Sequence, residues 1–345
     1  MTQKDPVRIG IVGLGRAGWA MHVRELRPLD GFRIVAGCDT IPERVEQLAQ
    51  EFDAKGYSRY EDLLNDGNVE LVAIATRSDT HAEIGVAALE AGKHVVLEKP
   101  IVVNLDEADR LVEADKRAAG QLLVRQNMRH NPAFLHVQEI IESGILGEVF
   151  EIKLCRHSFN RRNDWQTMKE FGGGQLNNWG PHIIDHALMF LGGQVENVYG
   201  ELKRVVCAGD ADDHVKIILQ GRSGLLVEIE ISGGVALGEP HYRVMGTRGT
   251  LVCDSKEVTV RRYDPSEALP LDLHPESPPQ DHPYGNPETL PWQEETFPVA
   301  PSRPTPAFYE LVYTTLREGE PFPITPDQAR QVVWVTDEVR KSATF

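Results

Sequence analysis

The sequence has few cysteines and no long apolar run. Cys38, Cys155, Cys207 and Cys253 are widely separated and form no C-x-x-C pair, which is typical of reduced thiols rather than of a disulfide framework. No stretch reaches the roughly 18 apolar residues of a membrane-spanning helix. The N-terminal segment MTQKDPVRIG places charge and a proline before a short apolar strand, unlike a secretory signal. We therefore expect a soluble cytoplasmic protein.

The sequence also has fewer basic than acidic side chains. The chain carries 36 lysines and arginines against 52 aspartates and glutamates, which gives a formal net charge of −16. Nucleic acids and anionic membranes both require a basic surface, so the composition predicts neither as a partner and favours a small-molecule ligand. The hydrophobic content of 41% is sufficient for a sizeable core.

The length of 345 residues predicts two domains. Through residue 125, short β-rich runs alternate with helical patterns, which predicts βαβ units and a parallel sheet. The expected strands are Val7 to Val12, Phe32 to Cys38, Val69 to Ala75, His94 to Leu97 and Gln121 to Val124. We place the first domain at residues 1–125.

Residues 126–345 show a different pattern, in which strand-like runs follow one another. The runs are Glu148 to Cys155, Val215 to Leu219, Leu225 to Ile231, Tyr242 to Met245 and Val258 to Arg262. This succession predicts a mostly antiparallel sheet in an α+β domain. The proline-rich residues 264–306 are expected to form an arm or loop without regular structure. Two helices, at residues 304–319 and 326–342, are expected to close the chain.

A glycine-rich turn follows the first expected strand. Residues 13–18 read G-x-G-x-x-G, the pattern in which the first glycine makes the turn, the second admits a pyrophosphate and the third lets the helix pack on the strand. The expected cofactor contacts here are Gly13, Gly15, Arg16, Ala17 and Gly18. Alone the pattern is weak, because glycine-rich turns are common, but its place between a strand and a helix predicts a dinucleotide site.

An acidic residue lies at the position that a dinucleotide site requires. Asp39 ends the second expected strand, 21 residues after Gly18, close to the roughly 20 expected of the carboxylate that accepts from a ribose hydroxyl. This carboxylate would repel a 2′-phosphate, so NAD is favoured over NADP. Arg44 lies five residues further on and could reach a phosphate, so NADP remains possible.

Two further motifs complete a pattern typical of one family. Glu98-Lys99-Pro100 follows the fourth expected strand, and GGGQLNNWGPHIID spans residues 172–185. Together with the glycine-rich turn, these motifs resemble the Gfo/Idh/MocA oxidoreductase family, which includes glucose–fructose oxidoreductase and inositol dehydrogenase. The resemblance covers nearly the whole chain: Ala75-Thr76, His81, Asn127, Arg129, Pro132 and Ser342 also stand at positions that match the family.

The resemblance implies a Rossmann domain followed by an α+β domain with a large, open, mostly antiparallel sheet, and an active site in the cleft between them. Such sheets commonly mediate oligomers in the family, so we expect a homo-oligomer, a dimer or a tetramer. The usual substrates are sugars, inositols or their derivatives, which are oxidised or reduced at one carbon with NAD(P). Further cofactor contacts are expected at Thr76, His81, Glu98, Lys99 and Asn127.

Carried over by position, four residues have catalytic roles. Lys99 polarises the reacting oxygen, and a neutral His182 takes the hydroxyl proton as hydride leaves carbon. Asn178 binds a neighbouring hydroxyl, and Asp185 is expected to support His182. Arg129, in the domain-crossing segment, is expected to bind substrate.

Residues 156–165, RHSFNRRNDW, mix cations, amides and an indole, the groups that bind a polyhydroxylated ring by hydrogen bonds and stacking. Their family position makes them a substrate loop, with His157, Arg161 and Trp165 as the expected contacts. Loops of this composition also occur without ligands, as surface charges around one packed tryptophan.

Two positions depart from the family pattern. Asn178 stands where the family usually has aspartate, four residues before His182, and an amide cannot raise the basicity of that imidazole as a carboxylate would. Arg77 stands where proline often follows Ala-Thr. The asparagine leaves a dehydrogenase possible, and it also leaves room for relatives that retain NAD and use transient oxidation to cleave or epimerise glycosides.

The segment LNNWGPHIIDH has two rival interpretations. His182 and His186 frame H-x-x-D-H, a near miss of the zinc pattern H-x-x-E-H, but aspartate is one methylene shorter than glutamate and no further ligand follows, so we expect no metal. A core helix accounts for the apolar positions Trp179, Ile183, Ile184, Ala187, Leu188 and Phe190, but not for His182 after a Gly-Pro entry. A catalytic helix, with a structural His186, is favoured.

These observations predict an NAD(P)-dependent oxidoreductase that acts on a sugar, inositol or glycoside hydroxyl. Two alternatives stay open. One is an NAD-retaining enzyme of the same family that cleaves or epimerises glycosides. The other is a non-catalytic sensor of a sugar or dinucleotide that uses the same cleft.

Overall fold

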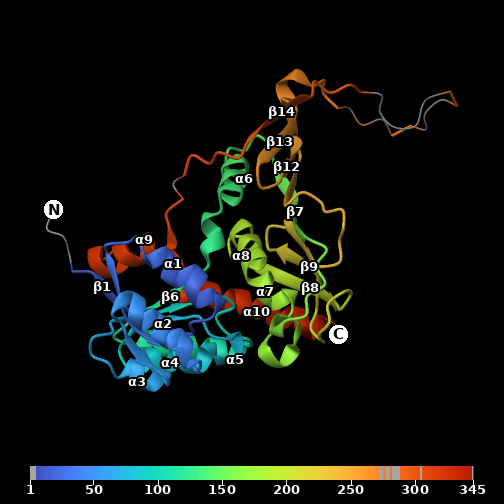
Figure 1. The fold of residues 1–345 in the computed structure, drawn as a ribbon. Helices are drawn as coiled ribbons and strands as arrows, with labels where there is room; N and C mark the ends of the chain where they lie inside the picture. The colour runs from blue at the N-terminus through green and yellow to red at the C-terminus, as the bar shows by residue number, and fades with distance from the viewer. Residues whose placement is uncertain are drawn as a thin grey trace.

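The computed structural model describes residues 5–271, 273, 275–276, 280–281, 288–303, 305–343 and 345. Figure 1 shows a first domain, coloured blue to teal, beside a second domain built on a tall sheet coloured green to orange. Each domain has its own sheet: one of six strands and one of eight. The expected combination of a Rossmann domain and a second domain with a mostly antiparallel sheet is confirmed.

The first sheet is wholly parallel, in the order β3-β2-β1-β4-β5-β6. Its strands are β1 (Val7–Val12), β2 (Phe32–Cys38), β3 (Lys55–Tyr57), β4 (Leu71–Ile74), β5 (His94–Leu97) and β6 (Leu122–Val124). Its helices are η1 (Gly18–Val23), α1 (Arg24–Leu26), α2 (Pro42–Phe52), α3 (Tyr60–Leu64), η2 (Ser78–Thr80), α4 (His81–Glu90) and α5 (Leu105–Arg117). Five of the six strands are at expected places, and β3 was not expected.

The central strands of this sheet are buried on both faces. Val7, Ile9 and Ile11 of β1 are all 0% exposed, and β4 reads as one continuous apolar run. Continuous runs of this kind are typical of parallel sheets, because helices cover both of their faces. The strand order reverses between β1 and β4, and ligands of open α/β sheets bind at the carboxyl ends of the strands beside such a switch point. The loops after β1, β4 and β5 meet there.

The second sheet has the order β14-β13-β12-β11-β7-β10-β9-β8, and only the pairing of β7 with β10 is parallel. Its strands are β7 (Val149–His157), β8 (Val195–Lys203), β9 (His214–Gly221), β10 (Leu226–Ser232), β11 (Tyr242–Gly246), β12 (Gly249–Cys253), β13 (Glu257–Arg262) and β14 (Gln293–Pro298). Its helices are η3 (Asn127–His130), α6 (Pro132–Glu142), η4 (Trp165–Thr167), η5 (Lys169–Phe171), α7 (Gln175–Asn178) and α8 (Gly180–Phe190).

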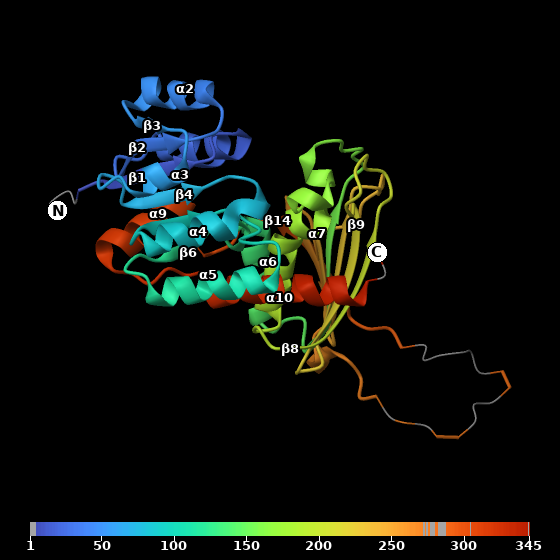
Figure 2. The same cartoon turned by 90° about the horizontal axis from the view of Figure 1, so that it is seen from below.

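Helices cover one face of this second sheet. Figure 2 shows α6, α7 and α10 (Pro326–Ser342) on the side that faces the first domain. Their apolar side chains form one core with alternate residues of the strands, such as Ile217, Ile229 and Val244, which are 0% exposed. The opposite face carries charged side chains paired across strands, including Lys153 with Glu228 at 3.0 Å.

The end of the chain returns to the first domain. Phe308, Tyr309 and Val312 of α9 (Phe308–Tyr313) belong to the same apolar core as Val7 and Ile9. The π-helix η7 (Thr314–Glu318) follows, and α10 then begins after Thr325, whose side chain accepts from the Gln328 backbone. The last helix matches its expected range, whereas the helix expected from residue 304 begins at Phe308; residue 304 itself lies outside the described residues.

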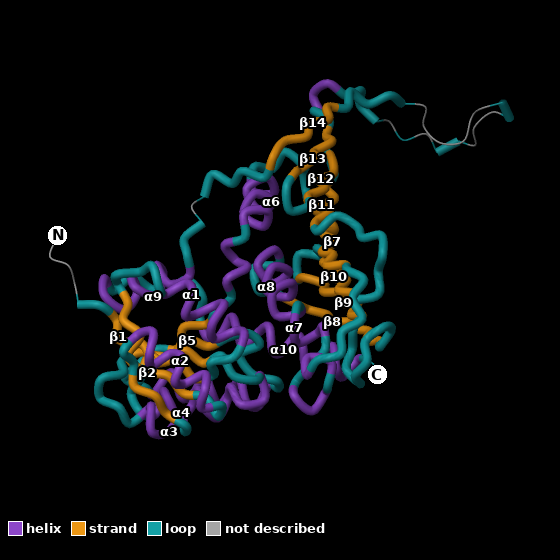
Figure 3. Tube along the Cα trace, in the orientation of Figure 1, coloured by secondary structure: helices purple, strands orange, loops and turns teal. Residues whose placement is uncertain are grey.

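The expectation that residues 264–306 lack regular structure was wrong in part. The short 3-10 helix η6 (Pro265–Glu267) and strand β14 both lie within this range, and β14 pairs with β13 along its whole length. Figure 3 shows β14 in orange at the top of the second sheet, next to the loop-coloured chain. In the described part of the chain, no helix combines the length and the apolar character needed to cross a membrane.

Candidate functional site

A cavity of about 830 Å³ lies between the two domains. It opens at the switch point of the first sheet and is closed on the other side by the segment between β7 and α8. Eleven of the residues expected in the site line it: Arg16, Ala17, Thr76, His81, Glu98, Lys99, Asn127, Arg161, Trp165, Asn178 and His182. The fold thereby brings together residues that are far apart in the sequence, such as Thr76 and Trp165, which are 89 positions apart.

The glycine-rich turn after β1 has the form that a dinucleotide requires. Gly13 has a φ of +91°, and a Cβ there would lie 2.7 Å from the Ala75 backbone. A Cβ on Gly18 would lie 2.0 Å from the Gly13 carbonyl oxygen, so only glycine permits this packing. Over Gly15, in contrast, only the Arg44 side chain comes near, at 3.7 Å. The backbone is open to a ligand at this one position, and the residues fit the pyrophosphate of NAD(P).

The Asp39 carboxylate organises this turn. Oδ2 accepts a hydrogen bond from the Leu14 backbone N–H at 2.8 Å, and Oδ1 accepts from the Ile41 N–H at 2.9 Å. Arg44 Nη1 lies 3.3 Å from Oδ2. The guanidinium of Arg44 therefore stands beside both the acidic residue and the second glycine of the turn.

His81 joins the loops that follow β4 and β5. Burial lowers the pKa of this imidazole, so the ring is neutral and has one N–H to donate. Nδ1 lies 2.8 Å from the Pro100 carbonyl oxygen, closer than Nε2 lies to the Thr76 carbonyl oxygen, at 3.3 Å. The N–H is best placed on Nδ1, where it holds the Lys99-Pro100 segment against the Thr76 loop.

Lys99 reaches across the cavity to the second domain. Nζ donates to the Asn178 backbone carbonyl at 2.7 Å and lies 3.3 Å from the Asn178 Oδ1. Burial lowers the pKa of Lys99, the charge of Glu98 opposes that shift and the charge of Arg162 adds to it. The stronger of the two contacts uses a main-chain oxygen, so it does not depend on whether asparagine or aspartate occupies position 178.

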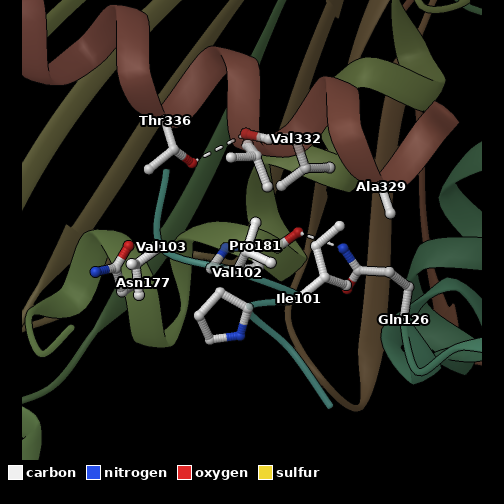
Figure 4. Close-up of a pocket in the computed structure, with 11 residues that line it drawn as sticks. Ile101, Val102, Val103, Gln126, Asn177, Pro181, Ala329, Val332 and Thr336 are labelled. Carbon is white, nitrogen blue, oxygen red and sulfur yellow. Dashed lines mark hydrogen bonds between the residues drawn. The ribbon is translucent and has the colours of Figure 1, made fainter. Parts of the chain in front are cut away.

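The segment after Lys99 is packed between the two domains. Figure 4 shows Ile101, Val102 and Val103 enclosed by the α10 helix on one side and the segment from Asn177 to Pro181 on the other. Gln126 Nε2 donates to the Pro181 carbonyl at 3.2 Å across this junction. This packing fixes the loop that carries Lys99 relative to the helices that carry Asn178 and His182.

His182 lies in the first turns of α8 and is 7% exposed. Its Nδ1 is buried and has no hydrogen-bond partner among the residues that the structure describes. Burial lowers the pKa of His182 well below its usual value, and the charge of Lys99 adds to the shift. The cavity therefore contains a neutral imidazole that can accept a proton.

Asp185 does not support His182 directly, contrary to expectation. Both of its oxygens are engaged by Arg129, whose Nε and Nη2 donate at 2.7 and 2.6 Å. Arg129 also donates from Nη1 to Gln328 at 2.7 Å. Neither Arg129 nor Asp185 lines the cavity. The guanidinium of Arg129 is committed to the buried pair, so Arg129 does not lie where its expected substrate contact would be made.

His157, another expected substrate contact, also lies outside the cavity. Its Nε2 lies 3.1 Å from Glu230 on the neighbouring strand, and its Nδ1 accepts from the Glu239 N–H at 3.2 Å. Arg161 and Trp165 do line the cavity. Within the described chain Arg161 makes no ion pair or hydrogen bond, whereas the guanidinium of Arg162 is held by Asp164 at 2.7 Å.

His186 has a structural environment. Its Nε2 lies 2.9 Å from the Met128 carbonyl oxygen, Nδ1 lies 3.3 Å from the Tyr242 hydroxyl, and its ring stacks on Phe134 at 3.8 Å. Within the described ranges, no group of three histidine, cysteine or acidic side chains is arranged to hold a metal ion.

Asp212 packs against the triple-glycine motif, and the sequence did not indicate this role. Gly174 has a φ of +102°, and a Cβ there would lie 2.2 Å from Oδ1 of Asp212. The other oxygen of Asp212 accepts from the Leu176 N–H at 2.8 Å, and burial raises the pKa of this carboxyl to about 6. The adjacent acids Asp212 and Asp213 were only a weak indication of this role in the sequence.

Arg77, the other departure from the family pattern, lies over the Phe171 ring at 4.4 Å and so links the two domains.

Two protein-family models match the chain. The oxidoreductase family with an NAD-binding Rossmann fold, GFO_IDH_MocA, matches residues 7–126. The GFO/IDH/MocA C-terminal domain matches residues 134–252. The segment that carries Asn127 and Arg129 lies between the two matches, and the matches contain the other residues that line the cavity.

Named relatives and solved structures agree with these matches. The chain is 30% identical over 263 residues to myo-inositol 2-dehydrogenase from Thermotoga maritima, covering 74% of this chain and 77% of that enzyme. It is 26% identical over 353 residues to scyllo-inositol 2-dehydrogenase (NADP(+)) from Bacillus subtilis, covering 98% and 94%. An NAD-binding protein from Listeria innocua superposes with a TM-score of 0.84 at 27% identity, covering 98% and 97% of the two chains.

Proposed function

The chain belongs to the Gfo/Idh/MocA oxidoreductase family, and from that membership we propose that it is a dehydrogenase that transfers hydride between NAD(P) and a hydroxyl-bearing carbon of a sugar, inositol or glycoside. One observation carries the proposal. The cavity brings Lys99 and His182 together at the carboxyl edge of the first sheet, next to Arg16 and Ala17 of the glycine-rich turn.

The chain can hold the cofactor along this edge. When bound, NAD(P) supplies the hydride acceptor. The glycine-rich turn and the N–H groups of the helix that begins at Arg16 would hold the pyrophosphate, and Asp39 would bind the adenosine ribose. Thr76, His81, Glu98 and Asn127 line the remainder of the path toward Lys99.

The chain's own groups then act on the substrate hydroxyl. Lys99 keeps N–H donors beyond those that bind Asn178, and it directs one to the reacting oxygen. The neutral ring of His182 accepts the hydroxyl proton as the C–H bond breaks. The Asn178 amide binds a neighbouring hydroxyl, and Trp165 and Arg161 contact the rest of the ring.

A panel experiment tests the proposal. Sugars, inositols and glycosides are added to the purified protein with and without external NAD or NADP, and the near-ultraviolet absorbance of the reduced nicotinamide is followed. Continuous growth that requires both a polyol and external cofactor is the expected result. The absence of any reduction with every compound, in protein that binds the cofactor, would contradict the proposal and favour the sensor.

Asn178 makes a second enzymatic function worth testing in the same panel. The asparagine leaves no carboxylate at this position beside Lys99, and NAD-retaining relatives oxidise their substrate only transiently. A single, stoichiometric absorbance change, accompanied by cleavage or epimerisation of a glycoside without external cofactor, would replace the dehydrogenase by this alternative.

Cofactor choice is expected to depend on Asp39. In Asp39→Asn, the charge that repels a 2′-phosphate is removed and Arg44, now 3.3 Å from the carboxylate, is released. A charge of this kind acts by about 1 to 4 kcal/mol at contact distance, so the ratio of kcat/KM for NADP to that for NAD is expected to rise at least about fivefold. Steady-state kinetics with each cofactor measure the ratio.

Arg44 provides the control for this prediction. Arg44→Gln in the Asp39→Asn background is expected to reverse most of the gain with NADP and to leave the values with NAD nearly unchanged. If Asp39→Asn leaves the cofactor ratio at its original value, the assignment of Asp39 to the ribose is wrong.

We also propose that the open face of the second sheet binds a second copy of the chain. Half-buried charges alternate there with exposed apolar side chains, such as Tyr199 at 52% and Ile218 at 37% exposure. Sedimentation of the purified protein is expected to give a dimer or a tetramer, and Tyr199→Glu is expected to shift the distribution toward the monomer.

A further inference from the structure

Four buried polar side chains form a chain of contacts behind Lys99. They come from four separate elements: His22 from η1, Glu98 from the end of β5, Arg125 from the end of β6, and Tyr309 from α9. None is more than 6% exposed. Only Glu98 lines the cavity, so the other three are buried groups that the proposed mechanism does not use.

The contacts run from α9 to the E-K-P motif. The Tyr309 hydroxyl lies 2.5 Å from Nδ1 of His22, and Nε2 of His22 lies 3.2 Å from Oε1 of Glu98. Arg125 Nε lies 2.9 Å from the same oxygen, and its other nitrogens donate to Glu25 at 3.1 and 2.7 Å. Tyr309 and His22 are 287 positions apart.

The tyrosine helps to determine where the imidazole carries its proton. Burial raises the pKa of Tyr309 well above its usual value, so the hydroxyl keeps its proton and can donate it to Nδ1 of His22. With Nδ1 acting as an acceptor, the ring N–H lies on Nε2, the nitrogen 3.2 Å from Oε1 of Glu98, although this contact does not have the geometry of a hydrogen bond. The carboxylate of Glu98 favours the same tautomer, so the hydroxyl and the carboxylate act on the ring from its two sides.

The state of Glu98 then affects its neighbour in the sequence. Burial alone would raise the pKa of Glu98, but contacts from His22, Arg125 and Lys99 outweigh it, and the pKa lies below its usual value. The negative charge of Glu98 in turn opposes the fall in the pKa of Lys99 that burial causes. The protonation of Lys99 is therefore coupled to a contact made by the far end of the chain.

We propose that His22 and Tyr309 are positioning residues for the reaction, which hold Glu98 as a carboxylate beside Lys99 and so keep the lysine charged. The proposal rests on the proposed function for its role in turnover, but not for the coupling itself. The charged and titratable groups that face Glu98 and Lys99 from the surrounding elements are His22, Glu25, His81, Arg125, Arg162, His182 and Tyr309.

The titration of Lys99 tests the coupling without any substrate. The whole chain is labelled with 13C at the lysine Cε, the Lys99 resonance is identified by its loss in Lys99→Arg, and its midpoint is followed with pH. Glu98→Gln is expected to lower the midpoint, and Asn178→Asp, which adds a carboxylate 3.3 Å from Nζ, is expected to raise it. These two variants show that the resonance reports local charge.

Tyr309→Phe removes only the hydroxyl and keeps the ring packing. We expect it to lower the Lys99 midpoint by roughly half a pH unit, and His22→Leu to lower it by at least as much. His22→Gln, whose amide can still donate to Glu98, is expected to recover part of the shift. Tyr313→Phe is the matched control, because Tyr313 lies on the same helix and its hydroxyl makes no hydrogen bond within the described residues.

In turnover, the alkaline limb of kcat/KM is expected to move to lower pH by the same amount in Tyr309→Phe. An unchanged Lys99 midpoint in Tyr309→Phe, or an equal shift in Tyr313→Phe, overturns the proposal. If no polyol is oxidised, the proposed function fails while the Lys99 titration still decides the coupling, so the two failures are distinguishable.

Discussion

Glutamine in place of His182 is expected to lower kcat by about 10² to 10⁴-fold, the range that a positioned general base contributes. His182 lines the cavity and is 7% exposed. Glutamine keeps a polar side chain there but cannot accept a proton at neutral pH. The measurement is the rate of cofactor reduction at saturating polyol, together with the dissociation constant of the cofactor, which is expected to change by no more than about threefold.

His186 provides the matched control, one helical turn further along α8. Its ring nitrogens face Met128 and Tyr242, away from any proposed role in catalysis. His186→Gln is expected to lower the midpoint of thermal unfolding but to leave kcat within about threefold, because it disturbs packing rather than proton transfer. A His182→Gln variant with kcat within about tenfold of the original would show that another group accepts the proton.

The pH profile provides an independent test of the same assignment. Burial, with the charge of Lys99, holds the pKa of His182 well below its usual value, so the ring is unprotonated throughout the neutral range. Activity is lost only when the pH falls through that lowered pKa and the base becomes protonated. The acid limb of kcat/KM is therefore expected below about pH 6.5 and is expected to be absent in His182→Gln.

Most of the first domain could be predicted because its strands are buried on both faces. β1, β2 and β5 have the expected bounds, and continuous apolar runs of this kind stand out in a sequence. Strand β3 could not be predicted in this way, because Lys55–Tyr57 is three residues long and only Tyr57 is half-buried. An edge strand that short contributes no periodic pattern.

Three strands of the second domain, β8, β12 and β14, were not expected, and the causes are similar for β14 and β8. β14 reads QEETFP, is almost wholly exposed and is the edge strand of its sheet, so no apolar alternation marks it. β8 is nine residues long, but its pairing with β9 shifts register between Val195 and Asn197. Such an irregularity breaks the period of two on which strand recognition depends.

The site could be predicted where a motif places residues at the ends of adjacent strands, and not where a contact depends on long-range packing. Lys99 follows β5, and only β4 separates that strand from β1, so topology alone places Lys99 at the same sheet edge as the glycine-rich turn. The pairing of Arg129 with Asp185 joins residues 56 positions apart, and that of Tyr309 with His22 joins residues 287 apart. Nothing in the local sequence indicates such partners, so Asp185 was expected to support His182, three residues before it.

Removal of the Asp185 carboxylate is expected to cause the largest loss of stability. Asp185 is 1% exposed and Arg129 8%, and two hydrogen bonds of 2.7 and 2.6 Å connect them. In Asp185→Ala the guanidinium remains buried without its counter-charge, which costs about 3–5 kcal/mol of unfolding free energy. Denaturant unfolding measures the difference, and Glu113→Ala, in the exposed pair with Lys116, is expected to change the free energy by less than about 0.5 kcal/mol.

Two further variants separate this structural role from support of His182. The double variant Arg129→Met with Asp185→Leu removes both charges, and because no unpaired charge remains it is expected to recover most of the stability. Asp185→Asn keeps the shape of the carboxylate but not its charge. If the pair is structural, Asp185→Asn lowers stability and leaves the acid limb of kcat/KM at the same pH. A shift of that limb to higher or lower pH in fully folded protein would mean that Asp185 acts on His182, the proton acceptor.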